Sequence, residues 1–84
     1  MTYRVTIASS ARREIDKLTT DIRKRIVARI LSLEQEPRPI GAIKKQGEDA
    51  YRIRVGDYRV IYSIEDTVKI VTVIKVGHRR DVYR

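Results

Sequence analysis

The chain has 84 residues without cysteine, and its nineteen Lys and Arg outnumber its eleven Asp and Glu, which gives a formal net charge of +8. A chain of this length predicts a single domain, residues 1–84, with no room for a deep cofactor cavity, and the absence of cysteine excludes disulfides, thiolate metal sites and cysteine nucleophiles. The excess of positive charge favours a polyanionic or acidic partner, of which nucleic acid is the commonest.

The first half of the sequence predicts a strand followed by two helices. Residues 3–7 alternate large and polar side chains, as a half-buried strand does, and Ser9 or Ser10 can supply the N-cap of a helix over residues 11–18. A short break with a second N-cap precedes a longer helix over residues 21–35, whose apolar stripe is wider. Because the break is short, we expect the two helices to form an antiparallel hairpin.

The second half predicts a loop and three strands. Two prolines end the second helix and open a surface loop over residues 36–49, which is basic at Lys44 and Lys45. The pattern then changes to the period of two that is typical of strands. Strands are expected over residues 51–55, 58–64 and 68–76. The last of these has β-branched residues on both faces, which favours a central position in the sheet.

The order of these elements predicts an α+β fold. An N-terminal strand and a helical hairpin come first and a three-strand antiparallel meander follows, so the helices should pack on one sheet face and leave the other open. No stretch approaches the roughly 20 apolar residues of a membrane span, and the N-terminus lacks the apolar run of a signal peptide. We therefore expect a cytoplasmic protein.

Arginines gather on the face that we expect to be open. If the apolar residues of the first strand after the loop face the helices, alternation places Arg52 and Arg54 on the opposite face. Arg59 joins them from the next strand, Arg79 follows the last strand, and Tyr83 adds a ring on which a base can stack. A guanidinium group matches two phosphate oxygens at once, and a basic face with aromatics is typical of proteins that bind single-stranded nucleic acid. The alternative is a solvated strand face with ordinary cross-strand charge pairs.

Two segments, YRIRVGDYRVIYSI at residues 51–64 and VGHRRDVY at residues 76–83, resemble the RelE/ParE superfamily of toxins of type II toxin–antitoxin systems, in particular its RelE-like branch. The resemblance covers essentially the whole chain. RelE-type members cut mRNA in the ribosomal A site, whereas ParE-type members share the fold and poison DNA gyrase, and an antitoxin neutralises both. The resemblance therefore implies a RelE-like fold and a ribosome-dependent mRNA endoribonuclease that inhibits translation. A RelB-like antitoxin, the ribosome and mRNA would be its partners.

The implied reaction is attack of a ribose 2′-hydroxyl on the adjacent phosphodiester, which leaves a 2′,3′-cyclic phosphate and a free 5′-hydroxyl. Carried over by position, the resemblance implies catalytic roles for Arg52, Arg54, Arg59, Arg79 and Tyr83. Fixed cations stabilise the negative charge that builds on the phosphorane, but arginines do not give up their protons near neutral pH. Arg52 and Arg54 occupy positions where RelE-like toxins often carry lysine, and the change to arginine argues against proton transfer by these two residues.

Two residues are candidates for proton transfer. Tyr83 can act as a base only if neighbouring cations lower its pKa. His78 is a candidate because histidine changes its charge near physiological pH, and its alternative interpretation is an exposed polar residue in a turn. Lys44, Lys45 and Arg80 are expected to contact RNA phosphates, with solvated loop lysines as the alternative for the first two.

The sequence predicts no metal and no cofactor, because it has a single histidine, no cysteine and no clustered carboxylates. The alternatives to the ribonuclease are a ParE-type inhibitor of DNA gyrase and a catalytically inactive homologue that only binds nucleic acid.

Overall fold

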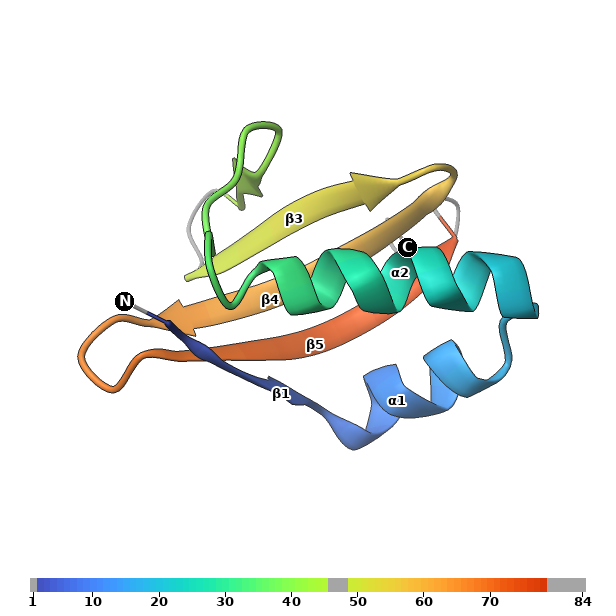
Figure 1. Ribbon diagram of the computed structural model, residues 1–84, viewed down its shortest axis with the longest axis horizontal. Helices are drawn as coiled ribbons and strands as arrows, with labels where there is room; N and C mark the ends of the chain where they lie inside the picture. The colour runs from blue at the N-terminus through green and yellow to red at the C-terminus, as the bar shows by residue number, and fades with distance from the viewer. Residues whose placement is uncertain (1, 46–48, 79–84) are drawn as a thin grey trace.

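The computed structural model describes residues 2–45 and 49–78, which form two helices and one five-stranded sheet. In chain order the elements are β1 (Arg4–Ile7), α1 (Ser9–Asp16), α2 (Thr20–Ser32), β2 (Ile43–Lys44), β3 (Ala50–Val55), β4 (Tyr58–Glu65) and β5 (Ile70–His78). Both helices lie on the same side of the sheet (Figure 1). The predicted α+β order and the helix-free sheet face are confirmed. Within the described ranges, neither helix has the length and apolar character that crossing a bilayer requires.

The sheet is mixed, with the strand order β1-β5-β4-β3-β2. β3, β4 and β5 form the predicted antiparallel meander. β1 pairs in parallel with β5, from Arg4 opposite Ile70 to Ile7 opposite Val73. β5 is therefore flanked by strands on both sides, as its β-branched sequence predicts. Local sequence patterns predict neither the parallel pairing nor the two-residue edge strand β2, because the choice of a strand partner depends on residues far away in the chain.

The helices begin earlier than the apolar pattern predicts. α1 starts at Ser9 with Ala8 at its N-cap, and α2 has Thr19 at its N-cap. Neither N-cap residue makes a side-chain capping hydrogen bond. The prediction of a serine cap is therefore wrong, because Ser9 and Ser10 already lie inside the first turn of α1.

The end of α2 turns the chain into the core. α2 ends at Ser32, three residues before the predicted end, and the N–H of Leu33 donates to the carbonyl oxygen of Ile30 at 3.1 Å. This spacing is that of a tightened last turn, and it directs Leu33 into the interior, where it is fully buried. The hydroxyl of Tyr62 then holds the following segment, because it donates to the carbonyl oxygen of Pro37 at 2.7 Å.

The core lies between the helices and one face of the sheet. Its large, fully buried side chains are Tyr62, Ile26, Ile30, Leu33, Ile53, Val60, Val71, Val73 and Val76. Tyr51 and Tyr58 pack half-buried against the same cluster. All three tyrosines therefore contribute to the core. Removal of this apolar surface from water is the main stabilising contribution in a domain of this size.

One residue of β5, Ile74, is inserted into an otherwise regular pairing with β4. Tyr62 lies opposite Val73, and the preceding residue, Ile61, lies opposite Lys75. This is the geometry of a β-bulge, which adds one unpaired residue to one strand. Before the bulge the odd-numbered residues of β5 face the core, and after it the even-numbered residues do. Simple alternation therefore assigns the wrong face to every residue after Ile74.

β5 also begins and ends two residues later than predicted. Lys69 has a positive φ of 58° in the turn before the strand, so Val68 belongs to that turn and is exposed. At the other end, Gly77 lies inside the strand, opposite Arg59, and the pairing continues to His78.

A hydrogen-bonded ion pair joins the loop after α2 to the turn between β4 and β5. The Arg38 guanidinium donates from Nη2 to Asp66 Oδ2 at 2.8 Å and from Nη1 to Oδ1 at 3.2 Å, and its Nε donates to the Tyr51 hydroxyl at 3.0 Å. The Tyr3 hydroxyl donates to Asp66 Oδ1 at 2.6 Å. These hydrogen bonds, first that of Arg38 and then that of Tyr3, lower the pKa of Asp66 to about 2.

A candidate nucleic-acid-binding face

The helix-free face of the sheet carries basic residues in two adjacent rows. In β3 and β4, Arg54 lies opposite Arg59, and Arg52 lies opposite Ile61. β5 extends the second row, because Lys75 also lies opposite Ile61. Residues that are opposite one another in neighbouring strands project to the same face of a sheet. The predicted placement of Arg52, Arg54 and Arg59 on one face of the backbone is therefore confirmed.

The floor between these basic side chains is apolar. Ala50 and Ile61 form a second small cluster, separate from the main core, and only 7% of Ile61 is exposed. Arg52 and Arg59 are half-buried, whereas Lys75 is exposed. Long basic side chains can cover apolar surface with their methylene stems while the charged ends stay in water. The face thus combines a small apolar floor with cationic groups around it.

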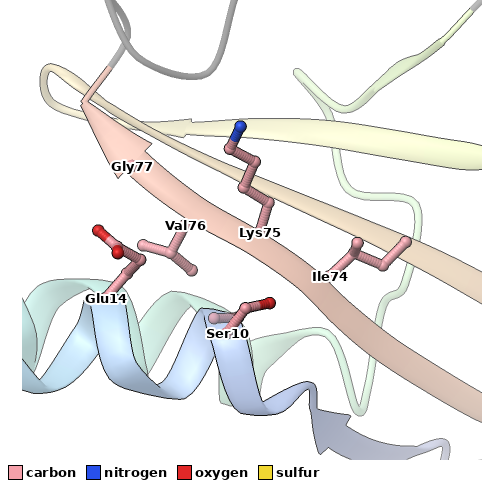
Figure 2. Close-up of a pocket in the computed structure, with 7 residues that line it drawn as sticks. Ser10, Glu14, Ile74, Lys75, Val76 and Gly77 are labelled. Atoms are coloured by element: carbon pink, nitrogen blue, oxygen red, sulfur yellow. The ribbon is translucent and has the colours of Figure 1, made fainter.

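Lys75 belongs to this face because of the bulge at Ile74. Figure 2 shows its side chain leaving β5 away from α1, whereas Val76 and Glu14 point into the space between the strand and the helix. Sequence reasoning missed Lys75, since alternation from Val73 places it in the core. The available signal was the lysine itself, a charged residue at a position that alternation assigns to the interior.

Arg54 departs from its neighbours at the edge of the sheet. Its backbone lies opposite Arg59, but its Nε donates to the carbonyl oxygen of Gly56 at 2.9 Å. The side chain lines a shallow hollow together with Arg25 and Arg29 of α2. Among the predicted arginines of the strands, Arg52 lies opposite Ile61 and Arg59 is two residues from it on the same face, whereas the Arg54 side chain turns to the edge of the sheet.

His78 projects to the other face of the sheet. It lies opposite Tyr58, whose ring packs against the core. The two rings meet edge to face, with centroids 5.5 Å apart and an interplanar angle of 74°. His78 is the half-buried last residue of β5, so the interpretation as an exposed turn residue is wrong. The structure does not bring its ring together with Arg52 and Arg59.

The loop lysines lie at the edge of the sheet where β2 pairs with β3. Lys44 in β2 lies opposite Tyr51 and so projects toward the helix side. The backbone N–H of Lys45 donates to the carbonyl oxygen of Ala50 at 2.8 Å, and both lysine side chains are exposed. The remaining predicted site residues, Arg79, Arg80 and Tyr83, lie outside the described residues.

The groups on this face suit an anionic ligand. A guanidinium donates two parallel hydrogen bonds to phosphate oxygens, and its charge persists at every physiological pH. Neither Arg52 nor Arg59 can accept a proton near neutral pH. Within residues 2–45 and 49–78, no group of three or more His, Asp or Glu is placed to hold a metal ion. The face can therefore bind and stabilise a phosphate, and it needs a separate group to move a proton.

The sequence matches known toxins along nearly its whole length. A family model described as the ParE toxin of the type II toxin–antitoxin system parDE matches residues 5–83. Toxin RelG of Mycobacterium tuberculosis is 33% identical over 86 residues, which cover 100% of this chain and 99% of the relative. Toxin RelE of the same organism is 31% identical over 84 residues, which cover 98% of this chain and 87% of the relative.

Solved structures with the same fold carry the RelE name. The archaeal RelE–RelB complex from Pyrococcus horikoshii OT3 superposes with a TM-score of 0.81 at 34% identity, over 94% of this chain and 97% of the other. The isolated E. coli RelE toxin gives 0.80 at 29% identity, over 96% and 90%. The intact E. coli RelBE toxin–antitoxin complex gives 0.80 at 26% identity, over 90% and 95%. The chain therefore belongs to the RelE/ParE family of toxins of type II toxin–antitoxin systems.

Proposed function

We propose that this toxin is a ribosome-dependent mRNA endoribonuclease that inhibits translation. The observation that carries the proposal is the helix-free face, where Arg52, Arg59 and Lys75 surround the apolar floor of Ala50 and Ile61. An apolar floor suits a base or a ribose, while the cations around it suit the phosphates on either side. The relatives that carry the RelE name support the same branch of the family.

In the proposed reaction, the ribose 2′-oxygen attacks the adjacent phosphorus and the bond from phosphorus to the 5′-oxygen breaks. Arg52 and Arg59 donate hydrogen bonds to the non-bridging oxygens, whose negative charge grows in the transition state. Removal of one such donor from an enzyme typically lowers kcat roughly 10²- to 10³-fold. The products are a 2′,3′-cyclic phosphate and a 5′-hydroxyl, whose oxygen has taken up a proton.

Proton transfer is assigned to residues at and beyond the end of β5. Because the arginines keep their protons, the proton of the 2′-hydroxyl passes to another group. Tyr83 is the first candidate for this base, since His78 starts from the opposite face and packs against Tyr58. Other basic residues are assigned to phosphate binding. Arg79 is proposed as a further ligand of the reacting phosphate, and Lys44, Lys45 and Arg80 as ligands of the flanking phosphates. Arg54 is proposed to contact RNA at the edge of the sheet.

The test is to induce the toxin in cells and map the 5′ ends of mRNA. We expect cuts within translated codons, each with a 5′-hydroxyl, that vanish in Arg59→Ala. Arg12→Ala removes the same charge from the exposed side of α1 and should leave the cuts in place. Cuts that persist in a folded Arg59→Ala variant would exclude this face from the reaction.

The match to a family model named for ParE favours one second candidate, inhibition of DNA gyrase. Growth arrest with intact mRNA, an induced DNA-damage response and loss of supercoiling by purified gyrase would establish that function. Growth arrest with neither mRNA cuts nor gyrase inhibition is not expected from either candidate. A chain that causes no arrest at all would be an inactive homologue that binds nucleic acid.

We also propose a RelB-like antitoxin as the partner of this chain. The relatives from P. horikoshii and E. coli were crystallised as complexes of RelE with RelB. The formal net charge of +8 favours an acidic partner, because complementary charge speeds association and excludes partners of like charge.

A further inference from the structure

A second basic site lies at the edge of β3, beside the helix-free face on which we propose that RNA is cleaved. It is a shallow hollow between α2 and the turn that joins β3 to β4. Its lining residues are Arg25, Ala28, Arg29, Ser32, Arg54, Val55 and Gly56. Three of the seven are arginines and none is acidic. β2 pairs with β3 only at Tyr51 and Arg52, so within the described residues no strand covers this part of the edge.

The turn between β3 and β4 fixes the side chain of Arg54 and lies next to that of Arg25. Arg54 Nε donates to the carbonyl oxygen of Gly56 at 2.9 Å, which turns its guanidinium over the strand edge. Gly56 has a positive φ of 60°, a conformation that favours glycine. The Arg25 guanidinium reaches the same residue, because its Nη2 and Nη1 lie 3.6 and 3.9 Å from where a Cβ on Gly56 would stand. The guanidinium groups of Arg25 and Arg54 therefore meet at one glycine.

Arg29 is the third arginine that lines the hollow. Arg29 follows Arg25 by four residues on α2, a spacing that places both on one side of the helix. Among residues 2–45 and 49–78, the ion pairs are Lys17 with Glu14 and Arg38 with Asp66, so Arg25, Arg29 and Arg54 have no acidic partner there. Three neighbouring guanidinium groups repel one another, and that repulsion is relieved when an anion binds.

We propose that this hollow binds a backbone phosphate of RNA that flanks the position of cleavage. The inference rests on the proposed ribonuclease function. Arg54 lines the hollow, and its backbone lies opposite Arg59 of the helix-free face, so the two basic sites are neighbours at the edge of β3. An RNA strand that crosses the edge of β3 can thus contact both, with one phosphate over the apolar floor and another in the hollow.

The chemistry of the lining favours RNA over an acidic protein. Protein partners anchor through aromatic or aliphatic side chains that fill apolar pockets. The apolar residues of this hollow are only Ala28 and Val55, and 8% of Val55 is exposed. Guanidinium groups around a shallow, solvent-facing surface instead match the two free oxygens of a phosphodiester.

The first experiment tests the hollow with inorganic phosphate alone. In the ¹⁵N-labelled toxin, the Nε–H signals of Arg25, Arg29 and Arg54 should shift on titration with phosphate and reach saturation. The signal of Arg12 on α1 serves as the control and should show only a small, unsaturable drift. Equal drift at all four arginines would overturn the inference.

The second experiment measures binding to ribosomes and to a short RNA oligonucleotide as a function of salt. Arg25→Gln and Arg29→Gln should each weaken binding and lower the slope of log K against log[salt], by at most about 0.7–0.9, the value for the complete loss of one phosphate contact. Lys24→Gln is the matched control, because it removes the same charge from the same helix outside the hollow, and it should leave the slope unchanged. The cleavage rate at saturating toxin should stay at the wild-type value in all three variants.

The outcomes separate this inference from the proposed function. Weaker binding to the oligonucleotide and to ribosomes identifies the message as the ligand, whereas weaker binding to ribosomes alone identifies ribosomal RNA. If Arg25→Gln and Arg29→Gln bind as Lys24→Gln does while cleavage persists, the hollow is not an RNA contact and the ribonuclease proposal stands. If the wild type neither binds RNA nor cuts it but phosphate saturates the hollow, both the ribonuclease proposal and the assignment to RNA are overturned. Circular dichroism melting of each variant confirms that a loss of binding is not a loss of folding.

Discussion

Single side chains determine how the loop after α2 is held against the sheet. Arg38, Asp66 and Tyr3 join three segments that are far apart in the sequence, and Tyr62 fixes Pro37 from within the core. The two contacts differ in environment, because the Tyr62 hydroxyl is buried and the Asp66 carboxylate is exposed. Their expected contributions to stability therefore differ in size and in dependence on pH.

Tyr62 should be the most sensitive of the tyrosines. Burial raises its pKa to about 12, which reflects a hydroxyl that is removed from water and bonded to the carbonyl oxygen of Pro37. Tyr62→Phe leaves that carbonyl without its partner and should lower the free energy of unfolding by about 1–3 kcal/mol. Tyr62→Ala also removes the ring and should cost about 3–5 kcal/mol. Urea denaturation measures both, and wild-type stability in Tyr62→Phe would contradict the buried hydrogen bond.

Tyr51→Phe is the control for this prediction. The Tyr51 hydroxyl accepts its hydrogen bond from Arg38 near the surface, where water can replace the lost partner. We expect a change in the free energy of unfolding of less than about 1 kcal/mol.

Asp66 should make the stability depend on acid pH. Hydrogen bonds from Arg38 and then Tyr3 hold its folded-state pKa at about 2, below the value of 3.8 for an unperturbed aspartate. Since the unfolded chain takes up the proton at a higher pH, the stabilisation is fully present above about pH 4 and is lost as the pH falls through about 2. The melting temperatures of wild type and Asp66→Asn should therefore converge over that range.

Arg38→Gln provides a second variant for the same measurement. It removes the main cause of the lowered pKa, so its melting temperature should also approach that of the wild type between about pH 4 and pH 2. A gap between wild type and Asp66→Asn that keeps its full size at pH 2 would show that the carboxylate charge is not the stabilising group.

At the scale of elements, the bulge in β5 decides which residues reach the helix-free face. With Ile74 as the extra residue, Lys75 lies opposite Ile61 and Val76 returns to the core. Removal of Ile74 would leave the pairs Tyr62–Val73 and Ile61–Lys75 unchanged and join them into a regular ladder. The bulge therefore accommodates the extra residue and keeps the strand register the same on both sides of it.

Deletion of Ile74 should accordingly leave a folded protein. Deletion of Thr72 removes one residue from the segment that pairs with both β1 and β4, and it should reverse the faces on one side of the gap. We expect a cooperative thermal transition for the first variant and none, or one at a much lower temperature, for the second. Equal loss of structure in both would mean that the bulge itself holds the sheet together.

Local patterns predicted most of the elements and part of the candidate face. Period-two alternation in β3 and β4 is regular, which is why Arg52 and Arg59 were placed on the correct face. The same reasoning fails in β5, because a bulge leaves no signature in the apolar pattern of a valine-rich strand. Lys75 was missed for that reason, and the position of His78 against Tyr58 depends on the same shift.

Local patterns did not predict the contacts between segments that are distant in the sequence. The apolar stripes located both helices, but their ends shifted by up to three residues because tertiary packing overrides cap preference. The partner of β1 and the hollow of Arg25, Arg29 and Arg54 each depend on elements that are brought together only by the folded chain. The guanidinium of Arg54 also had to turn over the strand edge to reach it.

At the scale of the whole molecule, the net charge of +8 works against compactness. Salt shortens the range of this repulsion from about 30 Å at 0.01 M to about 8 Å at 0.15 M ionic strength. The melting temperature of the free toxin should therefore rise between these two concentrations of sodium chloride. A fall over that range would indicate that attractive ion pairs outweigh the repulsion.

The strand order has a consequence for how the toxin is made. β5 lies between β1 and β4 in the sheet, yet it is the last of the described strands to be synthesised. A nascent chain that lacks β5 has no partner strand for β1 and no third strand for the meander. Neither the core nor the basic face can therefore assemble before β5 has been made. Such long-range closure also slows folding. A toxin proposed to attack translation thus acquires the surface for that function only after β5, the last of its described strands, has been synthesised.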